Sequence, residues 1–162
     1  MKIVDLNILL YAVNQDAVRH EPIRVWWERA LNGDEPIALA WVVILGFLRV
    51  ATHPRVFPRP LSAERALEKV DQWLAQPPVR VISDLPEQWR ILKTLLASCG
   101  TAGNLTTDAY LASLAIAHGA VLVSCDTDFA RFSKLRWQHP LGQSRRNVRS
   151  RIRGADRSSS VD

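Results

Sequence analysis

Three aspartates closely follow short apolar segments, at places where the carboxyl end of a β-strand is expected. Asp5 comes after residues 2–4, and Asp126 and Asp128 come after residues 120–123. In an open α/β sheet, ligands collect outside the carboxyl ends of the strands, near the point where the strand order reverses. The spacing therefore predicts that these carboxylates, although far apart in the sequence, lie at one edge of one sheet.

A fourth aspartate, Asp108, lies in the first turn of the helix predicted before residues 120–123, and we expect it to face the same edge. Carboxylates about 5 Å apart repel, and each pair costs about 3 kcal/mol at an effective dielectric constant near 20. A divalent cation removes this repulsion, and oxygen ligands without His or Cys suit Mg²⁺ or Mn²⁺. Such an ion can orient a phosphodiester, activate a water molecule and stabilise the leaving oxygen.

Each aspartate also has an ordinary structural explanation. Asp5 could cap the helix that follows it, and Asp108 could favour the positive end of its helix dipole. Asp126 and Asp128 could form Asx turns. It is the joint placement of several acids at one edge that favours a metal site over these separate explanations.

Other catalytic chemistries have less support in the sequence. It contains no dinucleotide-binding or P-loop glycine motif and no Gly-x-Ser-x-Gly nucleophile motif. A phosphatase that uses Asp5 as its nucleophile is an alternative, although the acid expected two residues later is Asn7 here. Cys125 has no visible histidine partner, so we interpret it as a small buried residue rather than a nucleophile.

The elements that must position these acids alternate between strands and helices. Short apolar segments predict strands at 2–4, 37–39, 79–82, 120–123 and, as a last edge strand, 135–137. Apolar residues at helical spacing predict two helices between each successive pair of the first four strands. Ser62 is expected to cap one helix, and Asp84 with Glu87 to form a capping-box-like pair before another. This order predicts an α/β protein with three α/β/α layers and a mostly parallel, twisted central sheet.

The net charge of +5 on this 162-residue chain is concentrated at the C-terminus. Residues 141–162 hold six Arg and two Asp, whereas residues 1–140 carry 15 basic and 14 acidic side chains. We therefore predict one domain over residues 1–140 and a basic tail over 141–162. The tail has too few apolar residues to fold and is expected to be disordered. It is either a solvated appendage or an arm that neutralises phosphates without sequence preference.

The composition also excludes several protein classes. Two cysteines, without metal-site spacing, do not suggest a disulfide framework or a zinc site, and free thiols suit a reducing cytoplasm, where we expect this protein. No apolar run approaches the roughly 20 residues of a membrane span, and Asp5 interrupts any signal-peptide core. The six tryptophans mostly fall on apolar helix faces, which favours core or dimer packing over base stacking.

Four segments, in this order within residues 1–141, carry a more specific signal. They are Val4-Asp5-Leu-Asn7-Ile-Leu-Leu-Tyr-Ala, Gly46-Phe-Leu-Arg-Val-Ala-Thr-His-Pro54, Thr107-Asp108-Ala-Tyr-Leu-Ala and Ser124-Cys-Asp126-Thr-Asp128-Phe129. Together they resemble the PIN-domain ribonucleases, and most nearly the VapC-type toxins of toxin–antitoxin pairs. The resemblance implies that residues 1–140 form a PIN-like nuclease domain.

The same resemblance implies a Mg²⁺- or Mn²⁺-dependent endoribonuclease that forms a homodimer and is inhibited by a cognate VapB-like antitoxin covering the active site. Asp5, Asp108 and Asp126 would be the catalytic, metal-binding acids, with Asp128 as a fourth ligand or a neighbour of the ligands. Two further residues would orient the ligands by hydrogen bonding, namely Asn7 and Ser124. Basic residues around the edge would contact the RNA; candidates are Arg49, Arg131 and Lys134.

Gly46 departs from the family pattern, which usually has a Glu just before the Phe-Leu-Arg segment. Glycine inside a helix costs about 1 kcal/mol relative to alanine, so we expect a packing reason for it. The missing acid favours one well-held metal ion over two. It also leaves an alternative function, that of a catalytically weak PIN-fold protein that binds RNA or a partner.

Overall fold

A five-stranded parallel sheet forms the centre of the protein in the computed structural model, which describes residues 1–100 and 102–142. The strand order is β3-β2-β1-β4-β5. The strands are β1 (Lys2–Val4), β2 (Ile37–Ala40), β3 (Val79–Ile82), β4 (Val121–Val123) and β5 (Trp137–Gln138). The basic tail was predicted for residues 141–162. Residues 143–162 lie outside the described part of the chain, so their predicted disorder stays a prediction.

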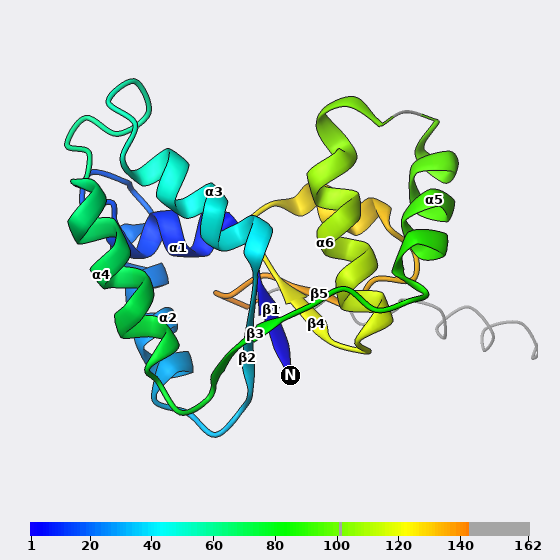
Figure 1. Cartoon of the computed structure of the whole chain (residues 1–162), viewed down its shortest axis with the longest axis horizontal. Coiled ribbons are helices and arrows are strands. Elements are labelled where there is room, and N and C mark those ends of the chain that lie inside the picture. Colours follow the sequence, from blue (N-terminus) through cyan, green and yellow to red (C-terminus); the bar gives the residue numbers. More distant parts are fainter. Residues whose placement is uncertain (101, 143–162) are drawn as a thin grey trace, which may run out of the picture.

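Six α-helices cover the sheet in the described part of the chain. They are α1 (Leu6–Val13), α2 (His20–Leu31), α3 (Trp41–Ala51), α4 (Ala63–Leu74), α5 (Gln88–Cys99) and α6 (Thr106–Ala117), with short 3₁₀ helices η1 (Gly103–Leu105) and η2 (Thr127–Arg131). Helices α1 to α4 lie on one side of the sheet, and α5 and α6 lie on the other (Figure 1). The predicted three-layer α/β/α fold is therefore confirmed. None of the helices within the described residues is long and apolar enough to cross a membrane.

The strand order reverses between β1 and β4. From β1 the chain moves outward to β2 and β3, then returns to the other side of β1 to add β4 and β5. Val4 pairs with Val123, and the backbone N–H of Asp5 donates to the carbonyl of Val123 at 3.0 Å. The residues that follow these two strands, Asp5 and Ser124, consequently lie side by side at the place where open α/β sheets bind ligands.

Aromatic side chains form much of the core between α2, α3 and α4. The ring of Phe47 lies 4.8 Å from that of Trp73, and Trp27 meets Trp73 edge-on at 5.9 Å, measured between centroids. The packing interpretation thus holds for Trp27 and Trp73, which are buried. Trp41 and Trp89 are 56% and 66% exposed in this single chain, so core packing does not apply to them and packing in a dimer stays a prediction.

Helix ends follow the local signals except before α5. Ser62 caps α4 as predicted, with its Oγ accepting the backbone N–H of Arg65 at 3.2 Å. The capping pair predicted for Asp84 and Glu87 is wrong, since α5 begins only at Gln88 and has no side-chain cap. Pro86 explains why Leu85 is not helical, because a proline disfavours helical backbone in the residue before it. The last strand begins two residues later and ends one residue later than predicted.

Gly46 has the packing reason that its place in a helix suggests. It is buried where α3 crosses α1, and a Cβ atom there would lie 3.0 Å from Cδ2 of Leu6. This distance is shorter than ordinary van der Waals contact, so a larger residue requires Leu6 to shift. Position 46 therefore lies against the residue that directly follows Asp5.

Candidate active site

Asp5 is the centre of the candidate site, at the junction of β1 and α1. Its side chain is buried, and it is the N-cap of α1, with Oδ1 accepting the backbone N–H of Leu6 at 2.6 Å. Oδ2 accepts hydrogen bonds from Nδ2 of Asn7 at 2.6 Å and from the hydroxyl of Ser124 at 2.7 Å. Three donors thus fix the carboxylate, so the capping explanation is confirmed and the hydrogen bonds expected from Asn7 and Ser124 are present.

Asn7 and Ser124 also connect Asp5 to the loop after β4. Nδ2 of Asn7 donates to Oγ of Ser124 at 2.9 Å, and its Oδ1 accepts the backbone N–H of Cys125 at 3.1 Å. Oγ of Ser124 in turn accepts the backbone N–H of Asp126 at 2.9 Å. This network fixes the loop backbone relative to α1. That the two residues orient a metal ligand stays a prediction.

Asp126 and Asp128 lie on the exposed side of this loop. Oδ1 of Asp126 accepts the backbone N–H of Asp128 at 2.8 Å and caps η2, so the Asx-turn explanation is confirmed for Asp126. Oδ2 of Asp128 forms an ion pair with Nη2 of Arg131 at 3.2 Å. Both aspartates are exposed, so their side chains have more freedom to rotate than Asp5 has.

The negative charges are close enough to perturb one another. Burial raises the pKa of Asp5 to about 6, and the charges of Asp108 and Asp126 contribute to the rise, against the hydrogen bonds from Ser124 and Leu6. Burial also raises the pKa of Asp108, which lies in the first turn of α6. The charges of Asp126 and Asp128 add to the Asp108 shift. The structure thus gathers all four predicted acids around one edge.

These acids do not form a ready-made metal centre. Among the residues that the structure describes, no three His, Cys, Asp or Glu side chains are grouped so that they could hold an ion. In this arrangement Asp5 and Asp126 accept hydrogen bonds from nearby donors, and their shared binding of one ion stays a prediction. The donor chemistry fits a hard cation, because every candidate ligand is a carboxylate oxygen.

Arg131 is a neighbour of the acids, and its ion pair with Asp128 was not predicted from the sequence. It was one of three basic candidates for RNA contact, and its charge opposes the rise in the pKa of Asp108. Its spacing of three residues from Asp128 within η2 is the signal that could have identified the ion pair.

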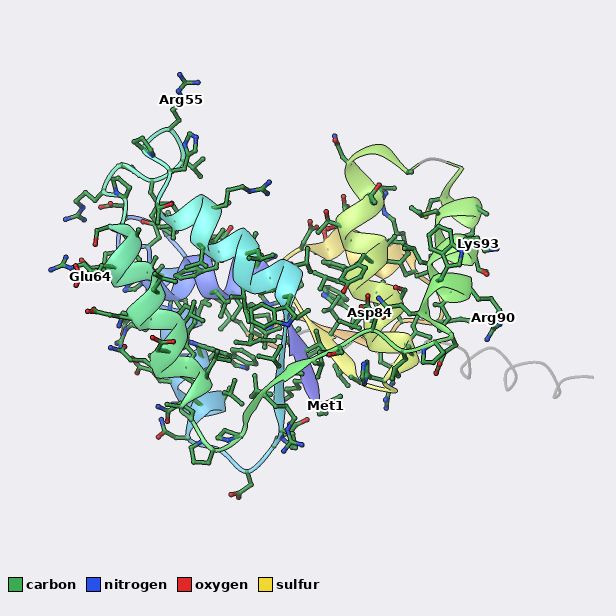
Figure 2. All side chains as sticks on the ribbon, in the orientation of Figure 1. Met1, Arg55, Glu64, Asp84, Arg90 and Lys93 are labelled. Carbon is green, nitrogen blue, oxygen red and sulfur yellow. The ribbon has the colours of Figure 1, made fainter. Side chains whose placement is uncertain are left out.

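Tyr110 and Asp84 form a second contact that the sequence did not indicate. The hydroxyl of Tyr110, on α6, donates to Oδ1 of Asp84 at 2.6 Å, and Figure 2 shows Asp84 beside α6. The contact joins residues 26 positions apart and fixes α6 to the segment after β3.

The surroundings of Cys125 disfavour a role as a nucleophile. The residue is buried, and burial raises the pKa of its thiol to about 11, although the charge of Arg19 opposes the rise. At neutral pH the side chain is therefore a protonated thiol, which is a poor nucleophile. The interpretation of Cys125 as a small buried residue is consistent with this geometry.

Comparison with known proteins decides the family. The profile of the PIN domain matches residues 2–135, a range that contains all four acids. The chain belongs to the PIN-domain family. Within that family it is 45% identical over 140 residues to Ribonuclease VapC37 of Mycobacterium tuberculosis. The aligned residues cover 86% of this chain and 97% of that protein. It is 43% identical over 141 residues to Ribonuclease VapC33 of the same organism, covering 87% and 99% of the two chains. This PIN-domain protein is therefore of the VapC type.

Solved structures support the same fold. A chain in the crystal structure of VapBC2 from Rickettsia felis, bound to a promoter DNA fragment, superposes with a TM-score of 0.64 and 22% identity and covers 85% of this chain and 97% of that one. A chain of VapBC-1 from nontypeable Haemophilus influenzae gives a TM-score of 0.63 at 17% identity, with 87% and 98% covered. At these identities the likeness concerns the fold.

Proposed function

We propose that this VapC-type PIN-domain protein is the toxin of a toxin–antitoxin pair and a Mg²⁺- or Mn²⁺-dependent endoribonuclease that hydrolyses RNA phosphodiester bonds. The observation that carries the proposal is the position of Asp5, held by three hydrogen bonds at the reversal point of the sheet and within the field of Asp108 and Asp126. The 45% identity to Ribonuclease VapC37 supports the substrate class.

In this proposal Asp5, Asp108 and Asp126 hold the cation, with Asp128 as a further ligand or a neighbour of the ligands. A bound cation supplies Lewis acidity for the phosphodiester and for the attacking water. The protein's own contribution begins with Asp5, because its three hydrogen bonds prevent the carboxylate from rotating away. Asp108 either binds the ion or positions the attacking water.

The proposal extends to partners and location. We assign the nuclease to residues 1–140, and we propose RNA as substrate, a homodimer as the active assembly, a VapB-like antitoxin as inhibitor and the cytoplasm as location. The antitoxin is supported by structural neighbours that are VapBC complexes.

Cleavage of RNA by the purified protein, free of any antitoxin, tests the proposal. Total cellular RNA is incubated with the full chain in Mg²⁺, in Mn²⁺ and in EDTA, and the products are mapped by primer extension. We expect cleavage only with metal, and a loss of at least about 100-fold in rate for Asp5→Asn. Asp71→Asn, which removes a charge from an exposed position on α4, is the matched control and should cleave like the wild type. Equal cleavage in EDTA, or by Asp5→Asn, contradicts the mechanism.

A second candidate function is RNA or partner binding without efficient cleavage. Two observations favour it: the acid usual in the family is Gly46 here, and the described carboxylates are not grouped to hold an ion. Under this alternative the protein retains labelled RNA in a filter-binding assay but leaves it intact in both metals. Binding without cleavage would select it over the ribonuclease.

A further inference from the structure

Residues 127–132 form a rigid support beside the acids. Phe129 and Phe132 are buried and their rings lie 6.2 Å apart between centroids. The carboxylate of Asp126 caps the N-terminus of η2. The backbone that carries Arg131 is thus held by the cap from Asp126 on one side and by the buried Phe132 on the other.

The guanidinium of Arg131 is only partly engaged by the protein. Its Nε donates to the backbone carbonyl of Asp128 at 3.1 Å, and its Nη2 pairs with the carboxylate of Asp128 at 3.2 Å. Within the described residues these bonds use two of its five N–H groups. The ion pair is also weak, because the two side chains are 39% and 60% exposed and exposed pairs contribute little.

The location of Arg131 suits an anion that must approach an acidic site. Its guanidinium lies 3.2 Å from the carboxylate of Asp128, on the short helix η2 that Asp126 caps, so it lies beside these acids. A phosphodiester is negative and is repelled by these acids. A planar guanidinium with unused N–H groups can bind two phosphate oxygens through a pair of parallel hydrogen bonds, a geometry that a lysine ammonium does not provide.

We propose that Arg131 binds the non-bridging oxygens of the phosphodiester that is cleaved. This inference rests on the proposed ribonuclease function. In the free protein Arg131 pairs with Asp128, and in the complex its remaining N–H groups contact the phosphate. Because the negative charge on these oxygens grows as the bond to water forms, the contact strengthens in the transition state and affects kcat more than KM.

Steady-state cleavage of a short RNA containing the wild-type cleavage site tests the inference, with Mn²⁺ as the metal. We expect kcat to fall about 100-fold in Arg131→Gln, as for other donors aimed at a transition-state oxyanion, with a much smaller change in KM. Arg131→Lys should recover part of the rate, because it keeps the charge but not the paired geometry. Arg90→Gln removes an equal charge from α5, where Figure 2 shows Arg90 on the side away from α6, and should leave kcat unchanged.

A double-mutant cycle with Asp128→Asn separates phosphate binding from a purely structural role. If Arg131 only positions Asp128, Arg131→Gln has no further effect in the Asp128→Asn background, and the inference is overturned. If it binds phosphate, the loss of about 100-fold is retained there. Wild-type cleavage together with full activity of Arg131→Gln refutes the role of Arg131 alone. Failure of the wild type to cleave any RNA in Mn²⁺ refutes the ribonuclease proposal and this inference with it.

Discussion

Replacing Asp5 with asparagine is expected to change the stability of the fold in a pH-dependent way. Burial raises the pKa of this carboxyl from 3.8 to about 6. A raised pKa means that the folded state binds the proton more tightly than the unfolded state does. Stability therefore falls as the pH rises from about 4 through about 6, where the buried carboxylate becomes charged, and the loss is complete above that range.

The size of the effect follows from the shift. At 1.36 kcal/mol per pH unit, a rise from 3.8 to about 6 corresponds to about 3 kcal/mol lost once Asp5 is ionised. About half of this loss falls between about pH 5 and about pH 7.5. Asparagine does not ionise, so the variant does not undergo this pH-dependent loss of stability. It does lose the hydrogen bond from Asn7, because its own NH₂ group faces another donor, and this costs about 1–3 kcal/mol at every pH.

Urea unfolding followed by tryptophan fluorescence measures the difference, because Trp27 and Trp73 are buried in the core. The quantity of interest is the free energy of unfolding of Asp5→Asn minus that of the wild type, measured in EDTA at several pH values. The constant hydrogen-bond cost cancels when two pH values are compared. We expect this difference in the free energy of unfolding to shift in favour of the variant by about 1.5 kcal/mol between about pH 5 and about pH 7.5.

Two results would refute this reasoning. One is a difference between Asp5→Asn and wild type that does not change with pH, which would mean that ionised Asp5 is not destabilising. The other is an equal pH-dependent change in Asp71→Asn, which would mean that loss of any negative charge has the same effect. Excess Mn²⁺ at about pH 7.5 provides a further check, because at 100 times Kd it should stabilise the wild type by about 2.7 kcal/mol. Asp5→Asn should lose this stabilisation.

Two further predictions concern the fold around the site. Ser62→Ala should lower the free energy of unfolding by about 1 kcal/mol, because it leaves the backbone N–H of Arg65 without its cap, and urea titration measures this directly. An unchanged urea midpoint would show that water replaces the cap without cost. Cys125 should resist iodoacetamide at neutral pH until the protein unfolds, because burial holds the pKa of its thiol at about 11. Cys99, which is half-buried, is the internal comparison, and mass spectrometry of the peptides distinguishes the two. Alkylation of Cys125 at the rate of Cys99 would contradict the assignment.

Much of the fold follows from local sequence signals. The helix Ala63–Leu74 was predictable because Ser62 can cap it and its apolar residues recur at helical spacing. The strand Val79–Ile82 was predictable because it is short, apolar-leaning and preceded by prolines. The order of such elements is enough to predict a parallel sheet with helices on both faces. It also predicts that Asp5 and Asp126 share an edge.

Contacts between distant side chains were not predictable in the same way. The hydrogen bond from Tyr110 to Asp84 spans 26 residues. No local pattern shows whether Asp84 caps a helix or accepts this distant hydrogen bond. The carboxylate of Asp126 is likewise turned toward the backbone N–H of Asp128, which periodicity does not describe. The sequence therefore predicted which acids gather at the edge but not how their oxygens are arranged.

The hydrogen bonds of Asp5 limit how it can bind a cation. A carboxylate offers about four lone-pair positions. Oδ2 uses both of its positions for Asn7 and Ser124, whereas Oδ1 uses one for the backbone of Leu6. One position on Oδ1 is left, so Asp5 can contribute a single metal–oxygen bond without breaking this network. The remaining protein ligands must then come from Asp108, Asp126 or Asp128, because Gly46 provides no carboxylate beside Leu6. The structural cap and the proposed ligand are thus one side chain, and capping by Asp5 is no argument against metal binding.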